Sequence, residues 1–404
     1  MTRSNQPSPL IAAAVRSVVV ALVAASLLAL FLVSAPSRRG SDRSLGAPAP
    51  AATTLYSYTP VTGAIFNRPI GSTTEQRRIF THVGNTIRSA PPGSTIRIAV
   101  FSFADVPTAN ALIAARARGV KVQLVFDDHT KYAQETRLQK ALGHNPNAAS
   151  FAVFCHLSCR GTTGGNMHDK IFLFSKAGDA SNITMVGSNN MTTYNATRQW
   201  SDIYTIANDP ATYYTYAGFF DQMKYDKPTG SFYQADINGY RTQFYPYPGT
   251  NQSTDPLSKA LAAITCTGAA AGIGVNGNTL VRISQHAWNG TRGLYLANKV
   301  VALRQAGCVV QVIYGVGMGS AVKSVLTRGG VALSTIRHPQ ARTHQKTLLV
   351  SGVYDGNPAA QVVFTGSHNW SNGALRRDDV VLRIENSAAY AQYAANFVDI
   401  WSHG

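Results

Sequence analysis

Two short stretches of the chain, 176 residues apart, decide its fold. Residues 167–170 read Met-His-Asp-Lys, and residues 343–346 read Thr-His-Gln-Lys. Each is followed by a Gly-Ser-x-Asn stretch, Gly-Ser-Asn-Asn at 187–190 and Gly-Ser-His-Asn at 366–369, and then by an Asp, Asp202 or Asp379. Motifs that recur in one order at nearly one offset indicate an internal duplication of about 175 residues.

The duplication extends beyond these motifs. Residues 66–71 match 244–249, and the tyrosines and phenylalanine of 213–220 recur in 390–397. β-branched runs alternate with Ala-rich helical runs, for example at 96–103, 107–118 and 120–126, and strand–helix–strand order implies a mixed or parallel sheet covered by helices. We therefore predict an α/β fold of two homologous halves, residues 53–228 and 229–404, each a mixed sheet flanked by helices.

The chemistry of the chain resides in the repeated motif. Residues two apart on a strand face the same side, so each His points the same way as the Lys that follows it. A pseudo-twofold axis between the halves would gather both sets in one shared pocket. The candidate site residues are His168, Lys170, Asn190, His344, Lys346, Asn369, Asp202 and Asp379.

Two imidazoles, two ammonium groups and two amides suit a phosphate diester. The lysines and amides would hold the non-bridging oxygens, one imidazole would attack phosphorus and the other would protonate the leaving oxygen. Asp202 and Asp379 are each expected to fix the tautomer of one imidazole. The alternatives are that each is a solvated acid at a strand end, or that Asp378 takes the place of Asp379. Further histidines, among them His129, His286 and His368, are candidates to line the mouth of the pocket, but each taken singly is interpreted as a surface or packing residue.

This constellation resembles the phospholipase D superfamily, whose signature is His-x-Lys, four residues, an Asp, and then Gly-Ser-x-Asn. Both copies match, except that Ser175 and Ser351 stand at the position of the signature Asp. The resemblance covers about residues 60–404. It implies a shared active site between two α/β halves and a phosphohistidine intermediate that forms without metal or cofactor. It favours His168 as the nucleophile and His344 as the acid.

Charge and composition restrict the class of partner. Hydrophobic residues make up 45% of the 404, which excludes general disorder, and 36 basic residues against 19 acidic ones give a net charge of +17. Residues 1–52 hold five basic residues and one acidic residue, so the remainder has 31 and 18, a net charge of +13. A basic body favours anionic partners: a phospholipid, a membrane surface or a nucleic acid.

The N-terminal segment predicts export. Residues 17–35 carry no charge and are mostly Val, Leu and Ala, which indicates a cleaved signal peptide or a retained membrane anchor, followed by a linker up to residue 52. The body would then lie outside the cytoplasm, secreted or anchored, where disulfides persist. Cys155 with Cys159, and Cys266 with Cys308, are the natural pairs by their layout; four buried free thiols are the alternative.

Three functions remain open from the sequence. The first is a secreted, monomeric phospholipase D that hydrolyses the headgroup of a glycerophospholipid. The second is an extracellular nuclease of the same superfamily, and the third is an inactive surface-binding module. Intact His, Lys and Asn residues in both halves count against the third, while two motifs in one chain and many aromatic residues favour lipid. The Tyr-rich stretch 233–247 is interpreted as an interdomain connector or as part of a rim that binds an amphiphile.

Overall fold

The computed structural model describes residues 57–162, 164–228, 230–249 and 251–404. These residues belong to one compact unit, Thr53–Gly404, which contains both copies of the repeat. The predicted signal peptide or anchor and its linker lie outside the described residues. None of the helices in the described ranges is long and apolar enough to cross a membrane.

The first half is built on a seven-stranded mixed sheet with the order β1-β8-β6-β5-β2-β3-β4. β2, β3 and β4 run parallel to one another, and the remaining neighbours are antiparallel. The strands are β1 (Gly63–Phe66), β2 (Thr95–Val100), β3 (Lys121–Asp127), β4 (Phe151–Cys155), β5 (Lys170–Ala177), β6 (Ala180–Gly187) and β8 (Asp202–Ile206).

The second half is built on a nine-stranded sheet with the order β14-β13-β12-β16-β17-β18-β10-β9, in which β11 also pairs with β16. Here β12, β13 and β14 are parallel, and the other pairs are antiparallel. The strands are β9 (Tyr233–Ile237), β10 (Tyr240–Phe244), β11 (Ile264–Thr265), β12 (Leu280–Trp288), β13 (Val309–Met318), β14 (Ala332–Ser334), β16 (Lys346–Tyr354), β17 (Asn357–Gly366) and β18 (Val380–Glu385).

The two sheets have one topology. Read from the parallel edge, β4-β3-β2-β5-β6-β8-β1 of the first sheet corresponds strand by strand to β14-β13-β12-β16-β17-β18-β10 of the second. The predicted duplication and the two-half α/β fold are therefore confirmed. The Tyr-rich stretch 233–247 is not a loose connector, because most of it forms the β9–β10 hairpin at the edge of the second sheet.

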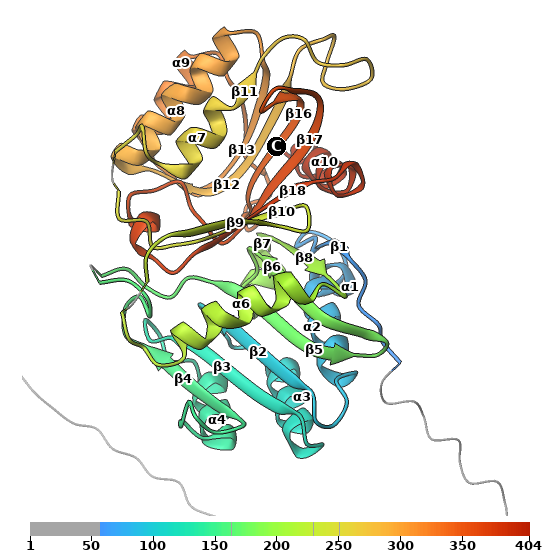
Figure 1. The fold of residues 1–404 in the computed structure, drawn as a ribbon. Coiled ribbons are helices and arrows are strands. Elements are labelled where there is room, and N and C mark those ends of the chain that lie inside the picture. The colour runs from blue at the N-terminus through green and yellow to red at the C-terminus, as the bar shows by residue number, and fades with distance from the viewer. Residues whose placement is uncertain (1–56, 163, 229, 250) are drawn as a thin grey trace, which may run out of the picture. The chain divides into compact units, whose positions relative to one another are not determined.

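Helices cover the sheets on both faces (Figure 1). The first half contains α1 (Thr73–Gln76), α2 (Arg78–Arg88), α3 (Val106–Ala117), α4 (Ala133–Leu142), α5 (Thr193–Arg198) and α6 (Pro210–Met223). The second contains α7 (Pro256–Ala262), α8 (Gly290–Gln305), α9 (Ser320–Arg328), the 3₁₀ helix η1 (Gly373–Arg376) and α10 (Ser387–Trp401). One core packs α2, α3 and α4 on the first sheet, and another packs α7, α8 and α9 on the second.

The third core is shared by the two halves. It joins the aromatic stripe of α6, including Tyr216 and Phe220, to residues of both sheets and to Tyr393 and Phe397 of α10. Tyr213 and Met223 of α6 are also buried, so the stripe is core packing, as its helical spacing predicts. The two halves are therefore joined by a common hydrophobic core.

Local signals in the sequence explain where the elements end. At the start of α3, the Asp105 carboxylate accepts hydrogen bonds from the backbone N–H of Thr108, at 3.0 Å, and from its hydroxyl, at 2.6 Å. Pro107 occupies the first turn of this helix, and Gly119, which follows it, has a φ of +89°. β3 begins two residues later, and its carboxyl end lies beside the functional site described below.

Candidate active site

Each His-x-Lys motif opens an inner strand of its sheet and is held by the opposite half. Lys170 is the first residue of β5, and Lys346 is the first residue of β16. The backbone N–H of His168 donates to the carbonyl of Asp378 at 2.9 Å, and that of His344 donates to the carbonyl of Trp200 at 2.8 Å. Two-residue strands beside the second motif, β7 (Gln199–Trp200) and β15 (Arg342–Thr343), pair in parallel across the halves. The predicted shared site therefore forms at the pseudo-twofold interface.

Asp379 lies directly beside the first catalytic candidate. Its Oδ1 is 2.8 Å from Nδ1 of His168 and also accepts the Ser367 hydroxyl at 2.5 Å. Burial alone would raise the pKa of Asp379, but the adjacent His168 holds it well below its usual range. Because a carboxylate only accepts hydrogen bonds, the Nδ1 of His168 carries the proton and Nε2 is left for chemistry. This is the geometry that the sequence predicts for an orienting Asp.

Asp202 differs from that prediction. Its carboxylate is fully buried and accepts the Ser188 hydroxyl at 2.6 Å and the Tyr393 hydroxyl at 2.9 Å, and it also accepts the Thr365 hydroxyl from the other half. His344 instead directs Nδ1 to the carbonyl of Ser188 at 2.9 Å. A carbonyl only accepts, so this contact favours the same tautomer as in His168 without a carboxylate, while Nζ of Lys346 also lies 3.1 Å from the same Nδ1. Asp202 acts on this ring through Ser188.

The two lysines place positive charge in a dry site. Nζ of Lys170 donates to the carbonyl of His168 at 2.6 Å, and Nζ of Lys346 donates to that of His344 at 2.6 Å. Burial lowers the pKa of Lys170 to about 7 and that of Lys346 well below its usual range. Burial, followed by the charge of the neighbouring lysine, also lowers the pKa of both histidines. Two buried amino groups beside two imidazoles can bind an anion, and binding it would favour the charged forms of the lysines.

Each Gly-Ser-x-Asn turn depends on its glycine. A Cβ on Gly187 would lie 2.1 Å from the carbonyl of Asp202, and one on Gly366 would lie 2.1 Å from that of Val380, so only glycine permits these close approaches. Asn190 and Asn369 are buried, and among the described residues Oδ1 of each has no hydrogen-bond partner. An amide oxygen only accepts hydrogen bonds, so binding of a phosphate oxygen would use the NH2 group of each side chain.

Serines replace the signature Asp in a supporting role. The Ser175 hydroxyl accepts the backbone N–H of Thr95 at 2.8 Å, and the Ser351 hydroxyl accepts that of Gly274 at 3.1 Å. Neither serine contacts a motif histidine. The two serines therefore change the hydrogen bonds between the motif strands and neighbouring segments. They do not belong to the residues proposed to react.

Sequence reasoning assigned no specific role to several residues of the site. Ser188 and Ser367 hold the two Asp side chains, and their place in the motif was the available signal. Phe101 packs edge-on against His168, with ring centroids 5.0 Å apart, and His286 takes the matching place against His344 at 4.4 Å. Knowledge of the strand register would have identified both residues. Phe101 follows the residue that pairs with Lys170, and His286 follows the residue that pairs with Lys346.

His129 and His368 also lie closer to the site than their interpretation as surface or packing residues suggests. His129 stacks on Phe101 with centroids 3.9 Å apart, and its Nδ1 is 2.7 Å from Oδ1 of Asp127. His368 is buried, stacks on Tyr245 and lies 3.5 Å from Oδ2 of Asp379. His368 therefore packs behind the orienting carboxylate, and His129 extends an aromatic wall outward from His168.

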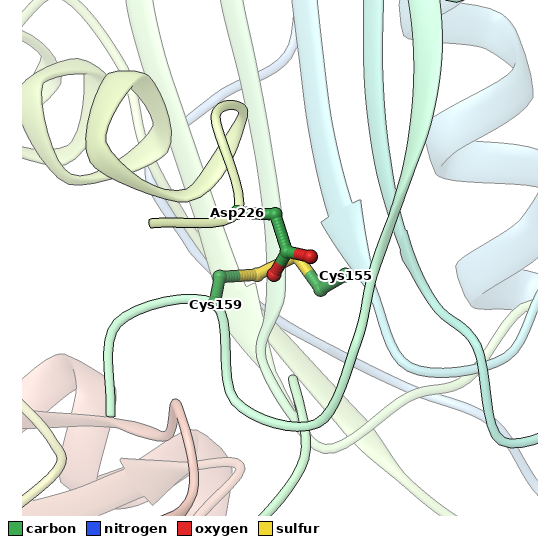
Figure 2. Close-up of side chains that lie close together, drawn as sticks. All are labelled: Cys155, Cys159 and Asp226. Atoms are coloured by element: carbon green, nitrogen blue, oxygen red, sulfur yellow. A yellow bond between two sulfur atoms is a disulfide. The ribbon is translucent and has the colours of Figure 1, made fainter. Parts of the chain in front are cut away.

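Both predicted cysteine pairs are present as disulfides, Cys155–Cys159 and Cys266–Cys308. The described residues contain one close group of potential metal ligands, which Figure 2 shows: Cys155, Cys159 and Asp226. The two sulfur atoms are bonded to each other, so they offer no thiolate to a metal. The group is better described as a disulfide beside a loop carboxylate, which accepts the backbone N–H of His156 at 3.0 Å.

Comparison with known proteins agrees with this geometry. The sequence model of the family described as "Cardiolipin synthase, PLD-like domain" matches residues 83–224 and 281–401, which together make up more than half of the chain and include both motifs. No match was found among curated proteins.

Two of the similar solved structures share the fold at low sequence identity. A phosphatidylserine synthase from Haemophilus influenzae Rd KW20 is 12% identical over 85% of this chain and 88% of its own, with a TM-score of 0.56. A polyphosphate kinase from Porphyromonas gingivalis is 11% identical over 83% of this chain, with a TM-score of 0.50, and the match spans 49% of that longer protein. Nuc, a phospholipase D family member from Salmonella typhimurium, is 22% identical over 41% of this chain and 96% of its own, with a TM-score of 0.31.

The motifs, the shared site and the family match agree with one another. The family match includes both motifs, and paired imidazoles beside buried lysines suit the chemistry of a phosphodiester. The chain belongs to the phospholipase D superfamily, as a protein with two PLD-like regions in one polypeptide.

Proposed function

We propose that this protein is a phospholipase D, which hydrolyses the headgroup ester of a glycerophospholipid through a phosphohistidine on His168. The proposal rests on the contact between His168 and Asp379, together with the burial of the two motif lysines. It provides a neutral imidazole with a fixed tautomer next to a site for an anionic phosphate.

The geometry suggests two chemical steps. In the first, Nε2 of His168 forms a bond to phosphorus, the bond from phosphorus to the headgroup oxygen breaks, and His344 gives a proton to that oxygen. In the second, His344 takes a proton from water, the water oxygen bonds to phosphorus, and the bond to His168 breaks. The products are the free alcohol and a phosphatidic acid. The ammonium groups and amides hold the non-bridging oxygens in both steps.

Binding of an anionic substrate would favour the protonated forms of the two lysines and of His344, which the reaction needs. Burial lowers the pKa values of the two lysines and the two motif histidines. A phosphate diester between Lys170 and Lys346 favours the charged forms of both lysines and of His344, because opposite charges stabilise each other. His344 can then carry the proton that the leaving oxygen requires.

Exposed apolar side chains favour a lipid as the substrate. Tyr194 is 63% exposed on α5, the helix that begins three residues after Asn190. Val316 is 68% exposed, and it follows Gly315, whose backbone packs against Thr343 beside His344. Large apolar residues exposed on segments next to both motifs suit contact with a membrane surface. The family description, which names cardiolipin synthase, points to the same class of substrate.

A nuclease remains the second candidate, because the net charge of +17 suits nucleic acid equally well. We further propose that the protein is exported, secreted or anchored by its N-terminal segment, and that it acts as a monomer. The two disulfides support export, since such bonds persist outside the cytoplasm.

The test compares the substrates directly. Purified protein is incubated with phosphatidylcholine, phosphatidylethanolamine and phosphatidylglycerol vesicles, and separately with plasmid and single-stranded DNA, with the His168→Ala variant as the control. Release of headgroup alcohol and phosphatidic acid by the unchanged protein alone supports the proposal. Cleavage of DNA without hydrolysis of any lipid identifies a nuclease instead.

A further inference from the structure

A second buried carboxylate, that of Asp378, lies next to Asp379 in the chain, and its oxygens accept no hydrogen bond from a histidine ring. It accepts three hydrogen bonds from one short loop of the first half. The Ser158 hydroxyl and the Arg160 N–H donate to Oδ1, at 2.8 and 3.1 Å, and the Cys159 N–H donates to Oδ2 at 2.6 Å. Asp378 is fully buried, so these donors replace the water that a carboxylate would otherwise bind.

The loop that surrounds Asp378 is closed by a disulfide. Cys155 is the last residue of β4, and its bond to Cys159 ties the three donors to the edge of the first sheet. The Ser158 hydroxyl also accepts the N–H of Gly161 at 2.7 Å, which sets its orientation. Farther along, a Cβ on Gly165 would lie 2.3 Å from the carbonyl of Arg376, so this segment packs tightly against the chain that leads to Asp378.

Asp378 connects this loop to the reacting histidine in two ways. Its carbonyl accepts the backbone N–H of His168 at 2.9 Å, and its own N–H donates to the carbonyl of Asn166 at 3.1 Å. It also precedes Asp379, whose carboxylate holds Nδ1 of His168. A shift of Asp378 would therefore move both the main chain of His168 and the carboxylate that orients its ring.

We propose that the loop closed by Cys155 and Cys159 positions the nucleophile, by holding Asp378 so that Asp379 stays against His168. Asp378 is a positioning residue in this scheme and touches no reacting atom. The inference rests on the proposed phosphohistidine chemistry for its effect on rate, but the contact it describes can be measured without turnover. The second motif has no equivalent arrangement. There, the carbonyl of Trp200 accepts the backbone N–H of His344.

Two variants and a matched control test the inference. The Cys155→Ser/Cys159→Ser double variant opens the loop, and Asp378→Asn keeps the size of the side chain but replaces one acceptor oxygen by a donor. Cys266→Ser/Cys308→Ser is the control, because that disulfide joins β11 to the start of β13 and neither cysteine touches a motif residue. For each we would measure kcat and KM with bis(p-nitrophenyl) phosphate, the pH profile of kcat, and the melting temperature.

Opening the loop or replacing Asp378 should lower kcat about 10- to 100-fold at a temperature where each variant is folded, since small misplacements of reacting groups cost this much. KM should change less than kcat, and the acidic limb of the pH profile should shift, because His168 loses its fixed partner. The control should keep its kcat. A fall in melting temperature with unchanged kcat and pH profile in both variants would show a purely structural loop and overturn the inference.

A spectroscopic measurement separates this inference from the proposed function. The Nδ1 proton of a histidine bonded to a buried carboxylate gives a far-downfield proton resonance, which is assigned to His168 by its loss in His168→Ala. The inference predicts that this resonance weakens or moves in Asp378→Asn and persists in the control. An unchanged resonance in Asp378→Asn refutes the inference, whatever the substrate. Absence of all phosphodiesterase activity in the unchanged protein refutes the proposed function alone.

Discussion

Oδ1 of Asp379, in the second half of the chain, lies 2.8 Å from Nδ1 of His168, in the first half. The two residues are 211 positions apart in the sequence, and both are buried. Neither half alone contains the complete pair, so the reacting imidazole depends on the association of the two repeats. This pair predicts how several variants will behave.

Replacing Asp379 by Asn should abolish most activity without unfolding the protein. The amide can present a donor to Nδ1 and so favour the wrong tautomer of His168, and loss of the corresponding carboxylate in a catalytic triad costs about 10⁴-fold in kcat. We expect a loss of about 10²- to 10⁴-fold in steady-state assays. The matched control is Asp399→Asn, at a half-exposed carboxylate paired with Arg68. A kcat within twofold of the unchanged protein would contradict the role given to Asp379.

Replacing Asp202 by Asn should affect stability more than chemistry. The amide keeps an acceptor for Ser188, but it turns a donor toward the hydroxyl groups of Thr365 and Tyr393. Leaving buried donors unpaired costs about 1–3 kcal/mol each, which urea denaturation can detect. The loss of kcat should be smaller than for Asp379→Asn, because His344 is held by a carbonyl. Equal losses of kcat in the two variants, at unchanged stability, would show that Asp202 orients a ring directly.

Activity should survive an excess of chelator. Lys170 and Lys346 supply the positive charge that a metal would bring to the phosphate, and both lie beside the motif histidines. The assay uses a soluble phosphodiester with EDTA, so that an effect of metal on a lipid surface does not interfere. Loss of turnover that one divalent cation restores would disprove the proposed roles of the lysines.

Acid should destabilise the fold through buried His82. This side chain is 4% exposed, and burial lowers its pKa to about 4, against about 6.5 in the unfolded chain. Between these values the unfolded state binds more protons, so the free energy of unfolding falls as the pH falls. From pH 7 to pH 5 this one group should remove about 2 kcal/mol.

The matched variant for this effect is His82→Gln, which cannot titrate but can still bond Tyr58 or Thr205. Chemical denaturation of both proteins at the two pH values gives the difference. The unchanged protein should lose about 2 kcal/mol more than the variant. Equal pH dependence in the two would mean that His82 is not the group responsible.

Much of this architecture could be predicted from the sequence, because the chain contains two copies of the same repeat. The motifs at 167–170 and 343–346 lie at the start of equivalent strands, and the matched position of Asp379 correctly placed it near a histidine. Symmetry was misleading at Asp202, where a serine carbonyl takes the place expected for the carboxylate. The repeats agree in topology, but side-chain partners were free to diverge between them.

The loop around Asp378 could not have been predicted in this way. Its donors lie 218 to 220 residues from the carboxylate they bind, and the segment has no matching copy in the second half. Layout alone correctly paired Cys155 with Cys159, but it gave no sign that this disulfide closes a loop against the chain preceding Asp379. A segment that is present in only one half has no counterpart for comparison, so its contacts can be found only in the tertiary structure.

Trapping of the covalent intermediate tests the central claim most directly. His344→Ala lacks the acid, but an activated phenol leaves without one, so this variant should complete a single round with a labelled p-nitrophenyl diester. Peptide mapping under alkaline conditions, which preserve the acid-labile P–N bond of a phosphohistidine, should then find the phosphoryl label on His168, and His168→Ala should carry none. Label on His344 in His168→Ala, with none in the reciprocal variant, would reverse the two roles. The absence of label in every variant, with inversion at phosphorus, would contradict a covalent mechanism altogether.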